Sequence, residues 1–112
     1  MTDANDLKNR VLAPADLVAV GPSAVVSRTL VDRPAGTLTV FAFDAGQGLS
    51  EHTAPYDATV LVLEGEGEFV VGGSAHRAPA GSMLIIPAGV PHSVRARQPF
   101  KMLLIMIRGL AP

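Results

Sequence analysis

Apolar and polar residues alternate along most of this chain, in short segments separated by glycine, proline, aspartate or serine. Period-two alternation is typical of strands with one buried face, and closely spaced turn residues are typical of β-sandwiches and barrels. The pattern therefore predicts an all-β fold. The expected strands are Val25–Leu30, Thr37–Phe43, Ala58–Leu63, Glu68–Val71, Ala75–Ala78, Met83–Ile86, His92–Arg97 and Lys101–Ile107.

The chain before the first predicted strand is different in character. Asp, Asn and Pro14 interrupt its few apolar positions, so at most a short turn of helix is expected there. A chain of 112 residues has room for a single hydrophobic core. We therefore predict an N-terminal arm at residues 1–24 and one β-barrel domain at residues 25–112.

The alternation also predicts which side chains face the interior of the barrel. After Pro91, His92, Val94 and Ala96 alternate with one serine and two arginines, and the arginines should face water. In the last predicted strand Lys101 should lie outside, which places every second residue after Phe100 on the inner face. The interior positions predicted in this way are His92, Val94, Ala96, Met102, Leu104 and Met106.

The outer face of the last strand is apolar too. Leu103, Ile105 and Ile107 alternate with the inward residues, and the segment 59–63 shows the same double-sided hydrophobicity. An antiparallel strand in a free-standing barrel usually has one wet face, so something should cover this one. A homodimer packed sheet to sheet is the simplest cover. The alternative is that the N-terminal arm covers it.

Composition excludes several classes of partner and site. The net charge of -1 offers no basic excess for nucleic acid, and no run approaches the length of a membrane-spanning helix. The polar N-terminus does not have the pattern of a secretion signal, so a cytoplasmic location is expected. The absence of cysteine excludes disulfides and thiolate metal sites.

Two histidines stand at the ends of glycine-framed segments. His52 follows Gly46 by six positions, and His92 closes the segment that begins at Gly81 and contains Pro87 and Gly89. The turn before His92 is expected to aim that side chain inward, with Gly89 supplying backbone freedom.

These positions resemble the motifs of a small single-domain cupin of the type-2, RmlC-like jelly-roll superfamily. Its first motif has the form G-x5-H-x-H-x3-4-E-x6-G, and its second G-x5-P-x-G-x2-H-x3-N. The matching positions are Gly46, His52, Gly65, Gly81, Pro87, Gly89 and His92. The resemblance implies a double-stranded β-helix, or jelly-roll, barrel with a pocket at one end.

The resemblance also implies a metal site, and here the sequence departs from the family. Metal-binding cupins hold one divalent ion with two histidines and a glutamate from the first motif and the histidine of the second. This chain has Ala54 and Ala58 at the second histidine and glutamate positions, and Ala96 replaces the final asparagine. His52 and His92 remain as ligands for iron, manganese, zinc, nickel or copper.

A third ligand would have to come from a neighbouring carboxylate. Asp57 precedes the lost glutamate position by one residue, and Glu51 adjoins His52. In a regular strand a shift of one residue moves a side chain to the other face, so either could serve only from a loop.

Alanine at two ligand positions implies a wider and less polar pocket. Such pockets are typical of small-molecule binding. We therefore predict a cupin that binds an unknown small molecule, with an incomplete, weak metal site; the alternatives are a metal-dependent dioxygenase or isomerase and a dimer with a vestigial pocket. The expected pocket residues are His52, Ala54, Tyr56, Ala58, His92, Val94, Met102, Leu104 and Met106.

Overall fold

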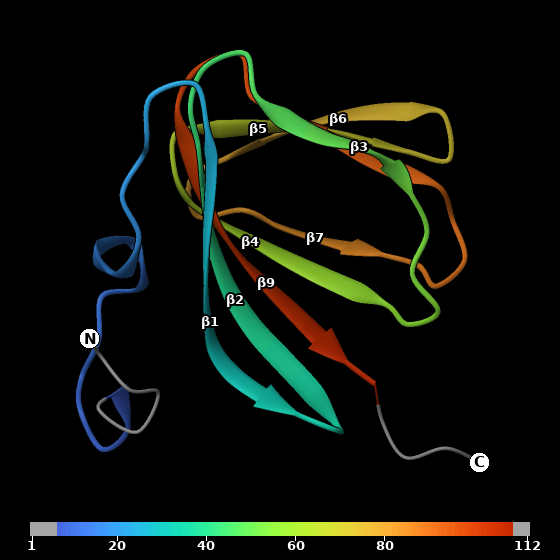
Figure 1. Cartoon of the computed structure of the whole chain (residues 1–112). Coiled ribbons are helices and arrows are strands. Elements are labelled where there is room, and N and C mark those ends of the chain that lie inside the picture. The colour runs from blue at the N-terminus through green and yellow to red at the C-terminus, as the bar shows by residue number, and fades with distance from the viewer. Residues whose placement is uncertain (1–6, 109–112) are drawn as a thin grey trace.

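Two antiparallel β-sheets face each other in the computed structural model, which describes residues 7–108 (Figure 1). In the larger sheet the strand order is β1 (Val25–Arg33), β2 (Gly36–Phe43), β9 (Phe100–Ile107), β4 (Ala58–Glu64), β7 (Met83–Ile86). In the smaller sheet it is β3 (Gly48–His52), β8 (His92–Arg95), β5 (Glu66–Val71), β6 (Ser74–Pro79). This arrangement confirms the predicted all-β jelly roll.

The strand prediction missed one element, β3. Gly48–His52 contains a single aliphatic residue, Leu49, so it lacks the alternation that marks a strand with a buried face. Its pairing with β8 is interrupted by a bulge between Leu49 and His52. The predicted strand that starts at His92 is also shorter than expected, because Ala96 bonds instead to Gly46 and Gln47 in the turn before β3.

Aromatic side chains close one end of the space between the sheets. The rings of Phe43 and Phe100 are stacked with centroids 4.6 Å apart, and Phe69 meets Phe100 edge to face at 6.2 Å. All three are essentially buried. A Cβ atom at Gly67 would lie 2.7 Å from the Phe100 ring, so only glycine fits against this cluster. The sheets diverge away from it, toward the loops that join β3 to β4 and β7 to β8 (Figure 1).

The described part of the N-terminal arm packs on the outer face of the larger sheet through a short 3-10 helix, η2 (Pro14–Leu17), and Val18. The helix contacts β2, β4 and β9. Val18, directly after it, is buried against Val40 and Ala42, and Leu103 packs at the edge of the same cluster. The arm therefore covers part of the apolar surface that the sequence predicts.

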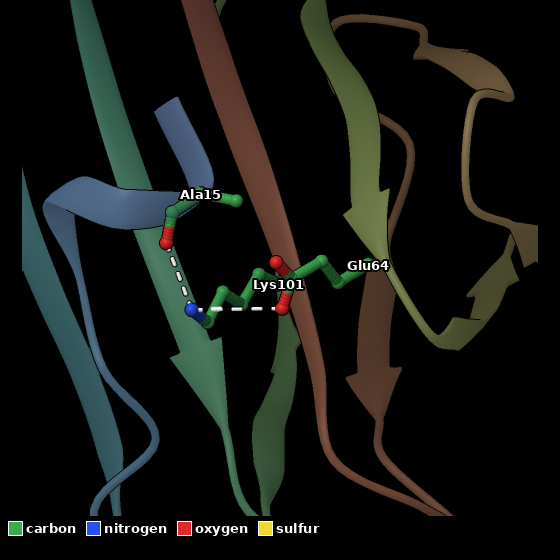
Figure 2. Close-up of polar contacts among 3 residues, drawn as sticks. All are labelled: Ala15, Glu64 and Lys101. Atoms are coloured by element: carbon green, nitrogen blue, oxygen red, sulfur yellow. Dashed lines mark hydrogen bonds and ion pairs between the residues drawn. The ribbon is translucent and has the colours of Figure 1, made fainter. Parts of the chain in front are cut away.

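Lys101 ties the arm to the sheet (Figure 2). Its Nζ donates a 2.8 Å hydrogen bond to the backbone carbonyl of Ala15 and lies 3.5 Å from a carboxylate oxygen of Glu64. The side chain is only 15% exposed. Lys101 thus lies on the outer face, as predicted, but under the arm rather than in water.

Other apolar side chains on the outer face are exposed among the residues that the structure describes. Met83 and Ile85 on β7 are 63% and 57% exposed, and Ile107 at the end of β9 is 70% exposed. Residues 7–24 of the arm do not cover this surface, and the predicted homodimer stays a prediction. No helix within residues 7–108 has the length and hydrophobicity to cross a membrane.

Replacing Lys101 by Met keeps the aliphatic stem and removes the charge. We expect the free energy of unfolding to fall by about 1–2 kcal/mol, because the Ala15 carbonyl loses a charged donor in a half-buried position. Chemical denaturation measures this difference. Arg95→Met on the other sheet, where Arg95 is exposed, is the matched control and should change little. Equal stability of the two variants would contradict a stabilising tether.

A homodimer that covers the outer face of the larger sheet should be sensitive to charge on β7. We expect sedimentation at micromolar concentration to give a dimer mass for the parent and a monomer mass for Ile85→Glu, because a carboxylate is costly to bury in an apolar interface. Ala75→Glu, exposed on the smaller sheet, is the control and should remain dimeric. A monomeric parent would overturn the dimer prediction.

Candidate functional site

A cavity of about 170 Å³ lies between the sheets. The smaller sheet contributes residues of β3 and β8, and the larger sheet contributes residues of β4, β7 and β9. Apart from two histidines, the lining residues within 7–108 are apolar. The lining residues are Leu49, His52, Ala54, Ala58, Val60, Ile86, His92, Val94, Met102, Leu104 and Met106.

Most of the pocket residues predicted from sequence belong to this lining. Tyr56 is the exception: it is half-buried in the loop after β3 but does not line the cavity. Val60 and Ile86 were not predicted, although Val60 shares a face of β4 with Ala58 and Ile86 pairs with Ala58 across β4 and β7. The alternation within β4 would have indicated Val60, whereas Ile86 required the strand pairing.

Leu49 was also missed, and the bulge in β3 explains why. Leu49 and His52 are three positions apart, so in a regular strand they would point to opposite faces. The bulge between them inserts an unpaired residue and brings both side chains to the cavity. No signal in the sequence indicates that bulge.

The two histidines meet across neighbouring strands. His52 on β3 and His92 on β8 are register partners, with ring centroids 4.3 Å apart and ring planes at 64°. His92 is only 6% exposed, whereas His52 is exposed. His92 is therefore the inner member of the pair and His52 the outer one.

Each imidazole is held by a backbone carbonyl two residues before it. His52 Nδ1 lies 2.7 Å from the Ser50 oxygen, and His92 Nδ1 lies 2.9 Å from the Val90 oxygen. A carbonyl oxygen only accepts hydrogen bonds, so each Nδ1 must carry the proton. In the neutral ring Nε2 is then the nitrogen with a free lone pair. The pair thus presents two acceptor nitrogens, the form in which histidine also binds metal ions.

The carboxylates considered as a third ligand do not complete a metal site. Asp57 Oδ1 accepts a 2.9 Å hydrogen bond from the backbone N–H of Ala88. Glu51 is exposed on β3 beside His52. Within residues 7–108 no three histidine, aspartate or glutamate side chains are grouped so that they could hold a metal ion.

Asp57 instead joins the two loops at the open end of the sheets. Its bond to Ala88 connects the loop after β3 to the turn before β8, and a second bond runs from Gly89 N–H to the Ala54 carbonyl at 2.8 Å. Gly89 has a φ of 77°, a conformation that favours glycine. The turn that carries His92 is therefore fastened to the loop that carries Ala54.

Unlike the cavity between the sheets, the outer face of the smaller sheet carries charged side chains. A hollow of about 200 Å³ there is lined by Glu66, Gly67, Glu68, Arg77, Arg97 and Gln98. Arg97 Nε and Glu68 Oε2 are 2.6 Å apart, so these two charges neutralise each other. The cavity between the sheets, with its apolar lining and two histidines, therefore suits an apolar ligand better than this charged hollow does.

Comparison with known families assigns the fold to a class. The model of the cupin domain family matches residues 39–107, which include both histidines and all the glycines of the two motifs. The chain therefore belongs to the cupin domain family.

Solved structures agree with this assignment. A conserved protein of unknown function from Streptococcus pyogenes is 35% identical, with a TM-score of 0.87 over 92% of this chain and 90% of that one. A cupin 2 conserved barrel domain protein from Leptotrichia buccalis is 38% identical, with a TM-score of 0.81 over 83% of this chain and 45% of that one. A cupin superfamily protein from Desulfitobacterium hafniense is 26% identical, with a TM-score of 0.84 over 89% and 92%.

More distant matches include named enzymes. Salicylate 1,2-dioxygenase from Pseudoaminobacter salicylatoxidans is 20% identical, with a TM-score of 0.69 over 74% of this chain and 26% of that one. At that identity the similarity shows the fold alone. No curated protein matches the chain.

The role of Asp57 can be tested through the turn that it holds. Asp57→Ala should make hydrogen exchange at the Ala88 amide about fivefold faster, because one hydrogen bond worth about 1 kcal/mol is lost. Asp57→Asn keeps an acceptor oxygen and should exchange at nearly the parent rate. The Val62 amide, bonded to Ser82, serves as an internal control. Unchanged exchange at Ala88 in Asp57→Ala would contradict the assigned role.

Proposed function

We propose that this cupin binds a small organic molecule in the cavity between its sheets, and that any divalent metal ion it binds is held weakly by His52 and His92. The observation that carries the proposal is the combination of a mostly apolar cavity with two neighbouring imidazoles. Concave apolar sites with few convergent polar groups are typical of ligand binding.

Ala58 keeps the wall of the larger sheet apolar where the cupin motif has a glutamate. It is 4% exposed and lies between Ile86 and Met106, its partners on either side in the larger sheet. A glutamate at this position in the family supplies charge to the cavity. With alanine here, the wall opposite the histidines is formed by aliphatic and thioether groups, which contact apolar ligands well.

The residues present fit a strongly held metal ion poorly. Two imidazoles suit iron, manganese, zinc, nickel or copper, and their carbonyl-bound Nδ1 atoms favour binding through Nε2. Specific sites usually add at least one more protein ligand, and none joins the pair among residues 7–108. Water would have to complete the coordination, which lowers the expected affinity.

A metal-dependent enzyme of the dioxygenase or isomerase type is the second candidate. The orientation of both imidazoles favours it, since each presents Nε2 as a metal ligand does. A bound ion would supply Lewis acidity or oxygen activation at the cavity. The chain's own contribution to such a reaction would be to orient a substrate against the apolar wall.

Zn²⁺ affinity tests whether the metal site is weak because histidine and glutamate are missing at positions 54 and 58. We expect Zn²⁺ to bind weakly to the parent, to be lost in a His52→Ala, His92→Ala variant, and to bind at least a hundredfold more tightly to Ala54→His, Ala58→Glu. Both restored side chains project from residues that line the cavity. Isothermal titration calorimetry measures the affinities.

The matched control places the glutamate one residue further along β4. Thr59 alternates with Ala58, so Ala54→His, Thr59→Glu directs the carboxylate to the other face and should gain much less affinity. Elemental analysis of the parent, purified without chelators, completes the test. A full equivalent of a transition metal there would overturn a weak site and support the enzyme.

A further inference from the structure

We infer that the ligand of the pocket is a neutral molecule about the size of a benzene ring that donates a hydrogen bond, such as a phenol. This inference deepens the proposed function and rests on it. It specifies which end of the ligand meets the histidines and which meets the larger sheet.

The first step concerns what the cavity can offer a polar group. Each Nδ1 lies within hydrogen-bond distance of a backbone carbonyl, which only accepts, so an imidazole in its neutral form has Nε2 left as an acceptor and no second N–H to donate. The other lining side chains are aliphatic or thioether groups. A hydroxyl or N–H group on a ligand can donate a hydrogen bond to an Nε2 at the cavity, whereas a ketone or an ether would find no donor among these side chains.

The second step concerns charge. None of the described residues that line the cavity is lysine, arginine, aspartate or glutamate. An ionised ligand would lose its hydration on entering the cavity and would find no permanently charged side chain of opposite sign there. Burial of such a charge in an apolar cavity is unfavourable. The lining therefore favours an uncharged donor.

The third step concerns size and orientation. Apolar protein cavities of about 150 Å³ accommodate benzene, and this cavity measures about 170 Å³. The acceptors lie together on one side, because His52 and His92 are cross-strand partners. Met102, Leu104 and Met106 lie on β9 in the opposite sheet. The ligand's donor thus points toward β3 and β8, and its ring lies against β9.

Phenol and toluene test this inference because they have nearly the same shape and differ in the donor. In a purely apolar pocket toluene should bind more tightly, since removing the phenol hydroxyl from water is costly. With acceptor nitrogens present we expect the parent protein to bind phenol about tenfold more tightly than toluene. The amide and side-chain NMR signals of His92, Val94 and Met102 report occupancy of the cavity.

A double variant identifies the acceptors. His52→Leu, His92→Leu removes both nitrogens while keeping side chains of similar bulk, and we expect it to bind toluene more tightly than phenol. Its fold is checked by circular dichroism. If it fails to fold, the comparison of the two ligands in the parent still decides the question, because it needs no substitution.

The possible outcomes separate the ligand class from the proposed function. Tighter binding of phenol in the parent, reversed in the variant, supports both. Equal or tighter binding of toluene in the parent overturns the donor requirement but leaves a small-molecule pocket. If neither compound shifts the signals of the cavity residues at millimolar concentration, the proposed function itself fails.

Discussion

The fold depends on one packing constraint. The two sheets share an apolar interior, and their side chains fill the space between the sheets at one end but leave a cavity at the other end. Phe43 and Phe100 stack in the narrow end, and Phe69 packs edge to face against Phe100. Gly67 allows the Phe100 ring to approach the backbone of β5. From there the inner face of β9 continues with unbranched or γ-branched side chains. A cavity therefore forms where the sheets diverge, next to the loops that join β3 to β4 and β7 to β8.

The outer faces of the two sheets have opposite characters. The smaller sheet carries paired charges on its outside, including Glu68 and Arg97, and is suited to water. The larger sheet is apolar outside, and the arm held by Lys101 covers only the part near Val40 and Leu103. Binding in the cavity and association through the larger sheet would use opposite faces of the same strands, because β4, β7 and β9 contribute to both surfaces. Alternation in each of these strands is what allows one segment to serve two surfaces.

The site keeps the backbone features of the two cupin motifs and differs from them at two positions where the motifs carry metal ligands. The glycines and Pro87 that shape the two histidine segments are all present, and both imidazoles are still aimed by carbonyl oxygens. Alanine at positions 54 and 58 removes the remaining donors while leaving the backbone pairing of β4 intact. The scaffold is thus kept, and the chemistry inside it becomes that of two acceptors in an apolar space.

Alternation and glycine-framed turns are local properties of the chain, so the strands with a buried face, the inward direction of His92 and Val94, and the family could all be predicted from the amino-acid sequence. Details that depend on partners distant in sequence could be read only from the folded chain. The bulge that turns Leu49 to the cavity exists against β8, and Ile86 lines the cavity through its pairing with Ala58. Asp57 looked like a candidate ligand, yet it bonds to Ala88, 31 residues away, and Lys101 reaches Ala15, 86 residues away. Hydrogen bonds between such distant positions are set by packing, and no local pattern encodes them.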